Sequence, residues 1–279
     1  MRTVRTVSEL RDDLRDAPRP VGLVPTMGAF HDGHLSLIRA AREENETLVV
    51  SLFVNPAQFG PSEDFGAYPR DEERDGRLAE AEDVDLLFAP PVEEVYPEGF
   101  SATVELGALT GTLEGESRGR EHFRGVTTVV TKLFNMVGPD RAYFGQKDAQ
   151  QALVIRRLVR DLNIPVEIRV CPTVREESGL AMSSRNAYLT DEERERAAAL
   201  SRALRAAEET VQLGELDAAA VLAAARAELD AAHIEPEYLE LRSVEDLSPV
   251  DRVNGSTLLA VAARVGRARL IDNTMLGGT

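Results

Sequence analysis

The segment VPTMGAFHDGHLSLIRAA, from Val24 to Ala41, joins two different hydrophobic patterns and decides how the first part of the chain folds. Just upstream, the apolar run Val21–Val24 predicts a short buried strand. After Gly33, apolar residues recur at helical spacing, which predicts a helix. The turn between them contains His31 and His34, two of the chain's four histidines. A strand that passes directly into a helix is the first half of a parallel βαβ unit.

The same alternation of strands and helices continues downstream. Continuous apolar runs predict buried strands, and apolar residues at helical spacing predict the helices between them. The strands are expected at Leu48–Val54, Val84–Phe88, Ala142–Phe144 and Val166–Val170, and two of the helices within 126–137 and 152–162. This order predicts an α/β fold, a Rossmann-like doubly wound parallel sheet, in a domain that spans residues 1–173.

The character of the sequence changes after residue 173. Thr190 and Glu193 form a capping-box signature before a long alanine-rich helix. A second alanine-rich helix is expected at Leu216–Ala231, followed by strands at Tyr238–Leu241, Thr257–Ala262 and Ala268–Ile271. We therefore expect residues 174–279 to form a smaller C-terminal α+β domain that closes over the site.

Composition excludes several classes of function. The net charge of −16 argues against a nucleic-acid partner, because binding a phosphate backbone requires clustered positive charge. No apolar run approaches the length of a membrane span, and the first residues lack the apolar region of a signal peptide. Cys171 is the single cysteine, which excludes an internal disulfide. We expect a cytoplasmic enzyme that acts on small molecules, with no membrane partner.

The two neighbouring histidines indicate an anion-binding site. His31 and His34 stand where a helix begins, and backbone N–H groups there already favour a phosphate. Two imidazoles can also donate hydrogen bonds to phosphate oxygens as charge builds in a transition state. The alternatives are a helix start with incidental polar residues, or a zinc site, for which no third ligand is obvious.

The segment FGQKDAQQ, Phe144–Gln151, also follows a predicted strand and opens a helix. Only two of the chain's 32 basic residues are lysines, and Lys147 is one of them. Its ammonium can reach phosphates, Asp148 can accept from a ribose hydroxyl, and Gln151 lies one helical turn further along. The plainer interpretation is a surface turn.

Two further segments carry polar side chains suited to binding. MSSRN, Met182–Asn186, offers two hydroxyls and a guanidinium to a triphosphate. FVNPAQF, Phe53–Phe59, sets two amide side chains among aromatic residues, which suits a small hydroxylated substrate. Each could equally be an ordinary loop.

In chain order, PTMGAFHDGH, FVNPAQF, YPRD, HFRGV, FGQKDAQQ, TVREESGLAMSSRN and NGS closely resemble the pantoate–β-alanine ligase family over essentially the full length. The His-Asp-Gly-His motif alone indicates only the wider HxGH nucleotidyltransferase superfamily. The sequence departs from the family at Gln146, where an acidic residue is common, and at Ala149, where an aromatic one is common. The segment Ser117–Phe123 is one residue longer than usual.

The resemblance implies ATP-dependent ligation of pantoate and β-alanine through a pantoyl adenylate, with Mg²⁺ as cofactor and a homodimer as the assembly. His34, His31 and Lys147 would be catalytic, and the resemblance gives His34 the role of proton donor. The chemistry of the step instead favours His34 as a hydrogen-bond donor to a phosphate oxygen. Pantoate would bind Gln58 and Gln151, and β-alanine would bind Gln58. The implied ATP-binding residues are Met27, Gly28, Ala29, Phe30, His31, Asp32, Gly33, His34, Gly145, Gln146, Lys147, Asp148, Val174, Met182, Ser183, Ser184 and Arg185.

Two other functions remain open at this point. An adenylyl- or cytidylyltransferase of the same superfamily would pass a nucleotide to a phosphorylated acceptor, and its acceptor pocket should be basic. A non-enzymatic nucleotide sensor would bind ATP and release no pyrophosphate. Products formed from ATP, pantoate and β-alanine discriminate among the three.

Overall fold

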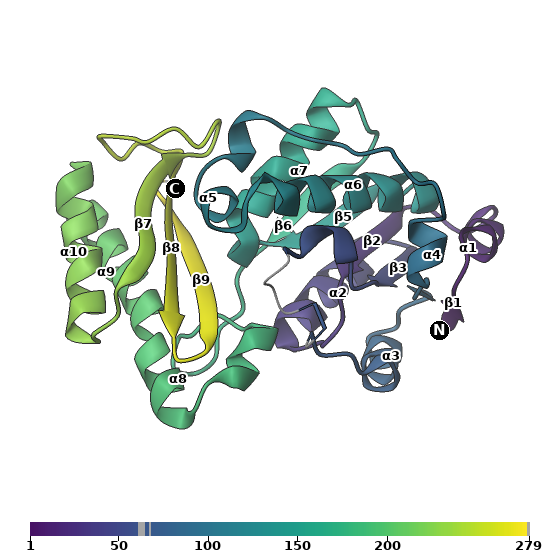
Figure 1. Ribbon diagram of the computed structural model, residues 1–279, viewed down its shortest axis with the longest axis horizontal. Coiled ribbons are helices and arrows are strands. Elements are labelled where there is room, and N and C mark those ends of the chain that lie inside the picture. The colour runs from purple at the N-terminus through teal and green to yellow at the C-terminus, as the bar shows by residue number, and fades with distance from the viewer. Residues whose placement is uncertain (61–64, 67, 278–279) are drawn as a thin grey trace. The chain divides into compact units, whose positions relative to one another are not determined.

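The structure is a computed structural model that describes residues 1–60, 65–66 and 68–277, and the chain forms two compact units (Figure 1). The first unit contains Met1–Gly145 and Gln150–Pro172. The second contains Gln146–Ala149 together with the chain from Thr173 onward. The four residues Gln146–Ala149 thus group with the second unit, although the sequence had assigned them to the first.

A six-stranded parallel sheet forms the centre of the first unit (Figure 1). Its strand order is β1-β4-β3-β2-β5-β6. From β2 the chain adds β3 and β4 toward one edge of the sheet, and it then returns to add β5 and β6 toward the other edge. This arrangement confirms the predicted Rossmann-like, doubly wound class. The bounds are β1 Arg2–Val4, β2 Val21–Thr26, β3 Thr47–Leu52, β4 Leu86–Phe88, β5 Arg141–Gly145 and β6 Glu167–Cys171. The edge strand β1 was not predicted, because only Val4 of its three residues is buried.

Successive residues of the central strands pack into two separate cores, because side chains alternate across a strand. Leu23 and Val49 face a core that also holds apolar residues of the helices α1 (Val7–Leu14), α6 (Arg120–Val137) and α7 (Ala149–Asp161). Their neighbours Val24 and Val50 face a second core with α2 (Asp32–Glu44) and α3 (Glu72–Ala81). Helices therefore cover both faces of the sheet, which explains why its strands read as continuous apolar runs.

The helices of the first unit are short apart from α2, α6 and α7. Their bounds are α1 Val7–Leu14, α2 Asp32–Glu44, α3 Glu72–Ala81, α4 Val92–Val95, α5 Glu114–Arg118, α6 Arg120–Val137 and α7 Ala149–Asp161, with 3₁₀ turns η1 at Pro56–Gln58 and η2 at Ala108–Thr110. The segment Ser117–Phe123 is helical except at Gly119, where α5 ends and α6 begins. Among the described helices of the whole chain, none is long and apolar enough to cross a membrane.

The second unit contains a three-stranded antiparallel sheet, in the order β7-β8-β9, with its own apolar core. Its elements are η3 Gln146–Asp148, η4 Ser184–Tyr188, α8 Asp191–Ala197, α9 Ala199–Gln212, α10 Ala218–Ala231, β7 Pro236–Ser243, β8 Thr257–Val265 and β9 Ala268–Leu276.

Two details of the second unit correct or extend the sequence prediction. The predicted capping box is present, with the Thr190 side chain accepting from the Glu193 N–H. The expected single long helix is instead two, α8 and α9, which meet at Ala198. Strand β9 runs beyond its predicted end at Ile271 and so includes Asp272 and Asn273.

Candidate active site

Strands β2 and β5 are neighbours in the sheet, and the strand order reverses between them. In open parallel sheets, ligands bind beyond the carboxyl ends of the strands at such a reversal. The chain leaves β2 after Thr26 and enters the His-Asp-Gly-His segment, and it leaves β5 after Gly145. The topology therefore directs attention to the residues that follow these two strands.

The residues after β2 form a tight loop, which we call the histidine loop, Met27–His34. Gly28 has φ +90° and Ala29 has φ +55°, so two successive residues adopt the left-handed conformation. A Cβ atom on Gly28 would lie 2.8 Å from the Leu52 side chain and 3.0 Å from Asp75 Oδ2. Glycine is therefore required at this position both for its backbone conformation and for space.

His31 caps the helix that follows the loop. Its Nδ1 accepts a hydrogen bond from the Gly33 N–H at 3.1 Å, and His31 itself is extended while α2 begins at Asp32. In a neutral imidazole whose Nδ1 accepts, the proton is on Nε2, which is then the donor atom of the ring. The His31 and His34 ring centroids are 4.2 Å apart, so the predicted pair does lie side by side.

A buried carboxylate that the sequence analysis did not single out secures the histidine loop. Asp75, on α3, is 1% exposed and accepts from the Ala29 N–H at 2.7 Å and the Phe30 N–H at 2.9 Å. Arg74 donates to the Phe30 carbonyl at 3.0 Å. Phe30 is itself buried, and its ring lies beside that of His34. Asp75 therefore fixes the backbone immediately before the two histidines.

Gln58, predicted to bind pantoate and β-alanine, lies buried at the end of η1. Asn55 Nδ2 donates to Gln58 Oε1 at 3.0 Å and to the Gly125 carbonyl at 3.2 Å. Asn55 Oδ1 accepts from the Ala57 N–H, which fixes the orientation of the Asn55 amide. The Gln58 carboxamide is thereby oriented too, with Oε1 on Asn55 and Nε2 3.0 Å from Met27 Sδ. Because a thioether is a weak acceptor, Nε2 is well suited to donate to a stronger one.

Helix α6 supports the turn that carries Gln58. Gly125 lies so close to η1 that a Cβ atom there would be 2.2 Å from the Ala57 carbonyl oxygen. His122 Nδ1 lies 2.8 Å from the Gln58 carbonyl oxygen, and its Nε2 lies 3.0 Å from Arg118 Nη1. Arginine can only donate, so Nε2 accepts and the neutral His122 ring donates from Nδ1 to Gln58. These contacts hold the backbone of Gln58 as firmly as Asn55 holds its side chain.

Nearby aromatic residues are also part of this arrangement. Tyr96 donates its hydroxyl to Asn55 Oδ1 at 2.8 Å, and burial raises the pKa of Tyr96 to about 12. The tyrosine therefore stays protonated and keeps donating at neutral pH. Lys132, the second lysine of the chain, places its ammonium 4.6 Å from the centre of the Phe100 ring.

In the second unit, the turn η3 presents Lys147. The Lys147 ammonium lies 3.6 Å from Asp148 Oδ1, and its side chain is 20% exposed. Asn273 of β9 donates through Nδ2 to the carbonyls of Gln146, at 2.9 Å, and Lys147, at 2.8 Å. Gln146 Nε2 donates in return to Asn273 Oδ1 at 2.9 Å. We call these residues, Gln146, Lys147 and Asp148, the lysine turn.

The remaining predicted ATP residues lie in a compact loop of the second unit. The Met182 N–H donates to the Val174 carbonyl at 3.0 Å, which joins the two ends of this loop. The Ser183 side chain caps η4 by accepting from the Arg185 N–H. Asn186, buried below them, donates to Glu176 Oε1 and to the Ala181 carbonyl. Val174 and Met182–Arg185 are thus held together as one group.

The structure accordingly divides the predicted site residues between the two units. The histidine loop, Gly145, Gln58 and Gln151 belong to the first, and the lysine turn, Val174 and Met182–Arg185 belong to the second. Gln151 is half-buried in α7, whereas its buried neighbour Gln150 donates to the carbonyls of Leu109 and Thr112. Within the described part of the chain, no group of three or more His, Cys, Asp or Glu side chains could hold a metal ion.

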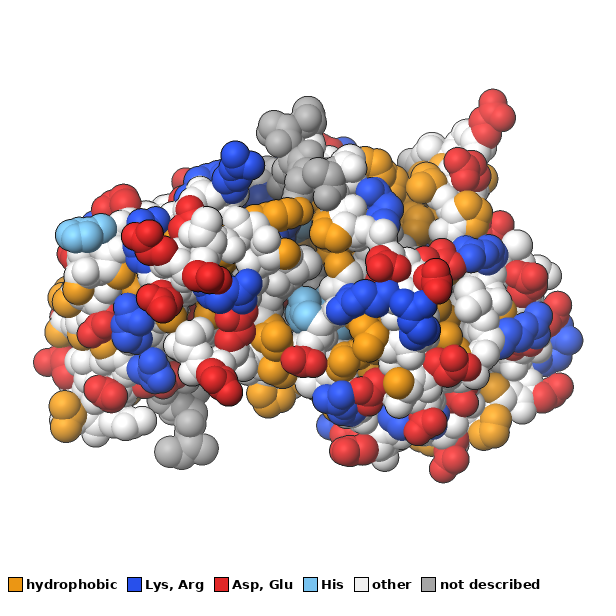
Figure 2. All heavy atoms as spheres, turned by 90° about the horizontal axis from the view of Figure 1, so that it is seen from below, with side chains coloured by type: hydrophobic (Ala, Val, Ile, Leu, Met, Phe, Trp, Pro, Cys, Tyr) orange, Lys and Arg blue, Asp and Glu red, His pale blue; other side chains and the backbone are white. Residues whose placement is uncertain are grey.

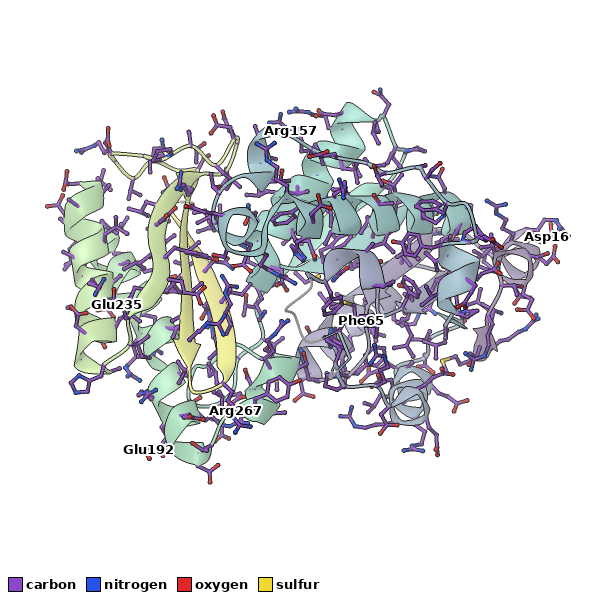
Figure 3. The ribbon with its side chains drawn as sticks, viewed as in Figure 1. Asp16, Phe65, Arg157, Glu192, Glu235 and Arg267 are labelled. Carbon is purple, nitrogen blue, oxygen red and sulfur yellow. The ribbon has the colours of Figure 1, made fainter. Side chains whose placement is uncertain are left out.

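Charged side chains elsewhere are mostly at the surface. Asp16, Glu192, Glu235 and Arg267 point away from the body of the protein (Figure 3). Acidic and basic side chains are interspersed on the face drawn in Figure 2. On this face the charge is therefore carried by solvated side chains of both signs (Figure 2).

Comparison with known proteins identifies the family. The sequence profile described as Pantoate-beta-alanine ligase matches residues 1–275. The chain belongs to this family. It is 54% identical over 277 residues to the pantothenate synthetase of Roseiflexus castenholzii, covering 99% of both chains.

Solved structures of the ligase family share the whole fold. A crystal structure of pantothenate synthetase from Thermus thermophilus superposes with a TM-score of 0.94 at 52% identity, covering 99% of this chain and 100% of that one. The pantoate–β-alanine ligase of Francisella tularensis, complexed with β,γ-ATP and β-alanine, has a TM-score of 0.82 at 34% identity, covering 99% and 97%. The resemblance seen in the sequence is thus confirmed over the full length of the ligase.

Proposed function

We propose that this protein is an AMP-forming ligase that joins pantoate to β-alanine, giving pantothenate, AMP and pyrophosphate. The observation that carries the proposal is the match to the ligase family over residues 1–275, with more than half of the residues identical to a pantothenate synthetase. The amide-lined surroundings of Gln58 also favour it over the transferase alternative, because a phosphorylated acceptor would need a basic pocket.

In the first step, a carboxylate oxygen of pantoate attacks the α-phosphorus of ATP. The bond to the bridging oxygen breaks, and pyrophosphate leaves with its electron pair, so that pantoyl adenylate remains. The carboxylate is already a nucleophile at neutral pH, so positioning and charge stabilisation supply most of the acceleration. No proton has to move in this step.

The residues that we assign to ATP supply hydrogen-bond donors and one ammonium. His31, through Nε2, and His34 donate to phosphate oxygens at the start of α2, where the helix dipole also favours negative charge. Lys147 neutralises the charge that develops on pyrophosphate as the bond breaks. The remaining ATP contacts come from the rest of the histidine loop, Gly145, Gln146, Asp148, Val174 and Met182–Arg185.

Pantoate and then β-alanine are held by amides. The orientation of Gln58, with Oε1 on Asn55, leaves Nε2 to donate to an oxygen of pantoate or to the β-alanine carboxylate. Gln151 is assigned to pantoate as well. In the second step the neutral amine of β-alanine attacks the acyl carbon, AMP leaves with the electrons of the carbon–oxygen bond, and the nitrogen loses one proton to solvent to give the amide.

Three finer features accompany this proposal. Mg²⁺ enters as part of the MgATP substrate, held by phosphate oxygens and water, because this small ion gives up its water reluctantly.

The protein works in the cytoplasm as a homodimer. Light scattering by the intact protein at micromolar concentration tests the dimer, and a monomer mass would contradict it. The second unit closes over bound ATP.

The test is isotope exchange between pyrophosphate and ATP. We expect exchange that requires pantoate and Mg²⁺ and proceeds without β-alanine, because the adenylate forms before the amine reacts. Exchange that strictly requires β-alanine would exclude a free-standing first step. Exchange with a phosphorylated acceptor in place of pantoate would support a nucleotidyltransferase, and ATP binding without any exchange would support a nucleotide sensor.

A further inference from the structure

One buried amide side chain determines the conformation of the lysine turn. Asn273 is 5% exposed and donates both hydrogens of Nδ2, to the Gln146 and Lys147 carbonyls. The turn is the short 3₁₀ helix η3, which passes directly into α7, and two of its carbonyls also accept from donors outside the helix. Asn273 supplies those donors from a strand of the antiparallel sheet.

We propose that Asn273 is a positioning residue for the adenylation step: it holds the backbone of the lysine turn so that the Lys147 ammonium meets the phosphates of ATP. The inference rests on the proposed function, because it takes Lys147 as the group that touches phosphate. Asn273 itself acts through Lys147 and touches no substrate.

The amide of Asn273 is held in a single orientation. Gln146 Nε2 donates to Asn273 Oδ1, and Asn273 Nδ2 donates to the Gln146 carbonyl. If the Asn273 amide turned over, its Nδ2 would face the donor Gln146 Nε2 and its Oδ1 would face a carbonyl oxygen. The Asn273 N–H donates to Asp272 Oδ1 at 2.8 Å. Asp272 is in turn buried and paired with Arg175 through both carboxylate oxygens, at 2.6 and 3.0 Å. The support for the turn is therefore rigid.

The neighbouring residue Gln150 shows that the support from Asn273 is specific to the turn. Gln150 Oε1 accepts from the Glu114 N–H, and its Nε2 donates to Leu109 and Thr112, all within the first unit. The start of α7 is thus secured separately from the turn that precedes it. Loss of Asn273 should disturb Lys147 without releasing α7.

The expected effect is on rate. A misplacement of about 1 Å in a group that contacts the transition state can cost roughly 10²-fold. We expect Asn273→Ala to slow single-turnover pyrophosphate release about 10- to 100-fold, with the KM for pantoate changed less than about threefold. Asn273→Asp keeps the shape and removes both donors, so it should lose about as much. Thr274→Val, on the same strand, is the control, because Thr274 bonds Glu208 and not the turn.

The decisive experiment is a double-mutant cycle with Lys147→Ala. If Asn273 acts through Lys147, Asn273→Ala should cost less than about twofold in pyrophosphate release when Lys147→Ala is already present. If the loss of rate in the double variant equals the product of the losses in the two single variants, the positioning role of Asn273 is overturned, while the role of Lys147 still stands. A Lys147→Ala variant as fast as wild type would overturn the phosphate contact that both ideas need, whereas the exchange assay on wild type tests the ligation itself.

Stability is measured on the same variants by thermal unfolding. Folded Asn273 variants with nearly wild-type melting temperatures and the non-additive rates above would support the proposal. Loss of the folded state in both Asn273→Ala and Asn273→Asp, with Thr274→Val stable, would assign Asn273 to folding alone and overturn it.

Discussion

The histidine loop and the lysine turn are each secured by one buried polar side chain, and the two side chains work with opposite polarity. Asp75 accepts hydrogen bonds from two backbone N–H groups of the histidine loop. Asn273 donates hydrogen bonds to two backbone carbonyls of the lysine turn. Both side chains are less than a tenth exposed, so water does not readily replace either partner.

The difference shows two ways in which a buried side chain can fix a short segment of backbone. In the histidine loop, the Asp75 carboxylate accepts from the N–H groups of Ala29, which has a positive φ, and of Phe30, just before α2 begins. In the lysine turn, the Asn273 amide donates to two carbonyl oxygens, and the Lys147 ammonium lies beside the Asp148 carboxylate. Asp75→Asn should therefore weaken the support of the histidine loop alone, and Asn273→Asp should weaken that of the lysine turn alone.

The largest effect is expected for Asp75→Asn. An amide can accept from one of the two N–H groups but turns its own NH₂ toward the other, so two charge-assisted hydrogen bonds are lost or weakened. We expect the free energy of unfolding to fall by about 3 kcal/mol, measured by urea denaturation. Asp71→Asn is the matched control, because Asp71 caps the same helix at the surface, where asparagine caps about as well. Equal losses in the two variants would refute the role of Asp75.

Lys147→Arg tests what the lysine turn presents. A guanidinium is larger and fixes its hydrogen bonds in a planar fork, so it can hold ATP and still fit the departing pyrophosphate poorly. We expect similar ATP affinity by calorimetry and a loss of roughly 10²-fold in single-turnover pyrophosphate release. Lys132→Arg should change the rate little, because arginine can also lie over the Phe100 ring. A Lys147→Arg enzyme as fast as wild type would mean that any cation serves there.

The smallest effect is expected for Gln146→Glu, which introduces an acidic side chain of the same length. The substitution removes the donation to Asn273 Oδ1 but leaves both bonds from Asn273 to the carbonyls. We expect a loss of about 1 kcal/mol or less in stability, read as a small shift in melting temperature, and a rate within about tenfold of wild type. A loss as large as that of Asn273→Ala would show that Gln146, rather than the Asn273 donors, secures the turn.

Much of the fold could be predicted because local patterns decide it. Apolar runs marked the central strands, helical spacing marked α2, α6 and α7, and alanine content marked α10. The break at Ala198 carries neither glycine nor proline, so a local pattern does not reveal it. The placement of Gln146–Ala149 in the second unit depends on Asn273, which is more than a hundred residues away in sequence.

The sequence singled out candidate ligand-binding residues and missed the buried side chains that support them. His31, His34 and Lys147 stand out because these residue types are rare in the chain. Asp75 follows Asp71, Glu72, Glu73 and Arg74, and so it reads as one more solvated charge. The one available signal was its helical spacing to Ala79, which is also buried. Buried polar supports resemble surface residues until their backbone partners are known.

The grouping of Gln146–Ala149 with the second unit matters for recombination between related ligases. A crossover near residue 173 would keep every strand of the parallel sheet from one parent. It would also take residue 146 from that parent and residue 273 from the other. Here those positions hold two amides bonded to each other, a pair that a parent with an acidic residue at position 146 would not reproduce. Chimeras that inherit residues 146 and 273 from the same parent should keep the conformation of the lysine turn, even when the rest of the chain changes parent near residue 173.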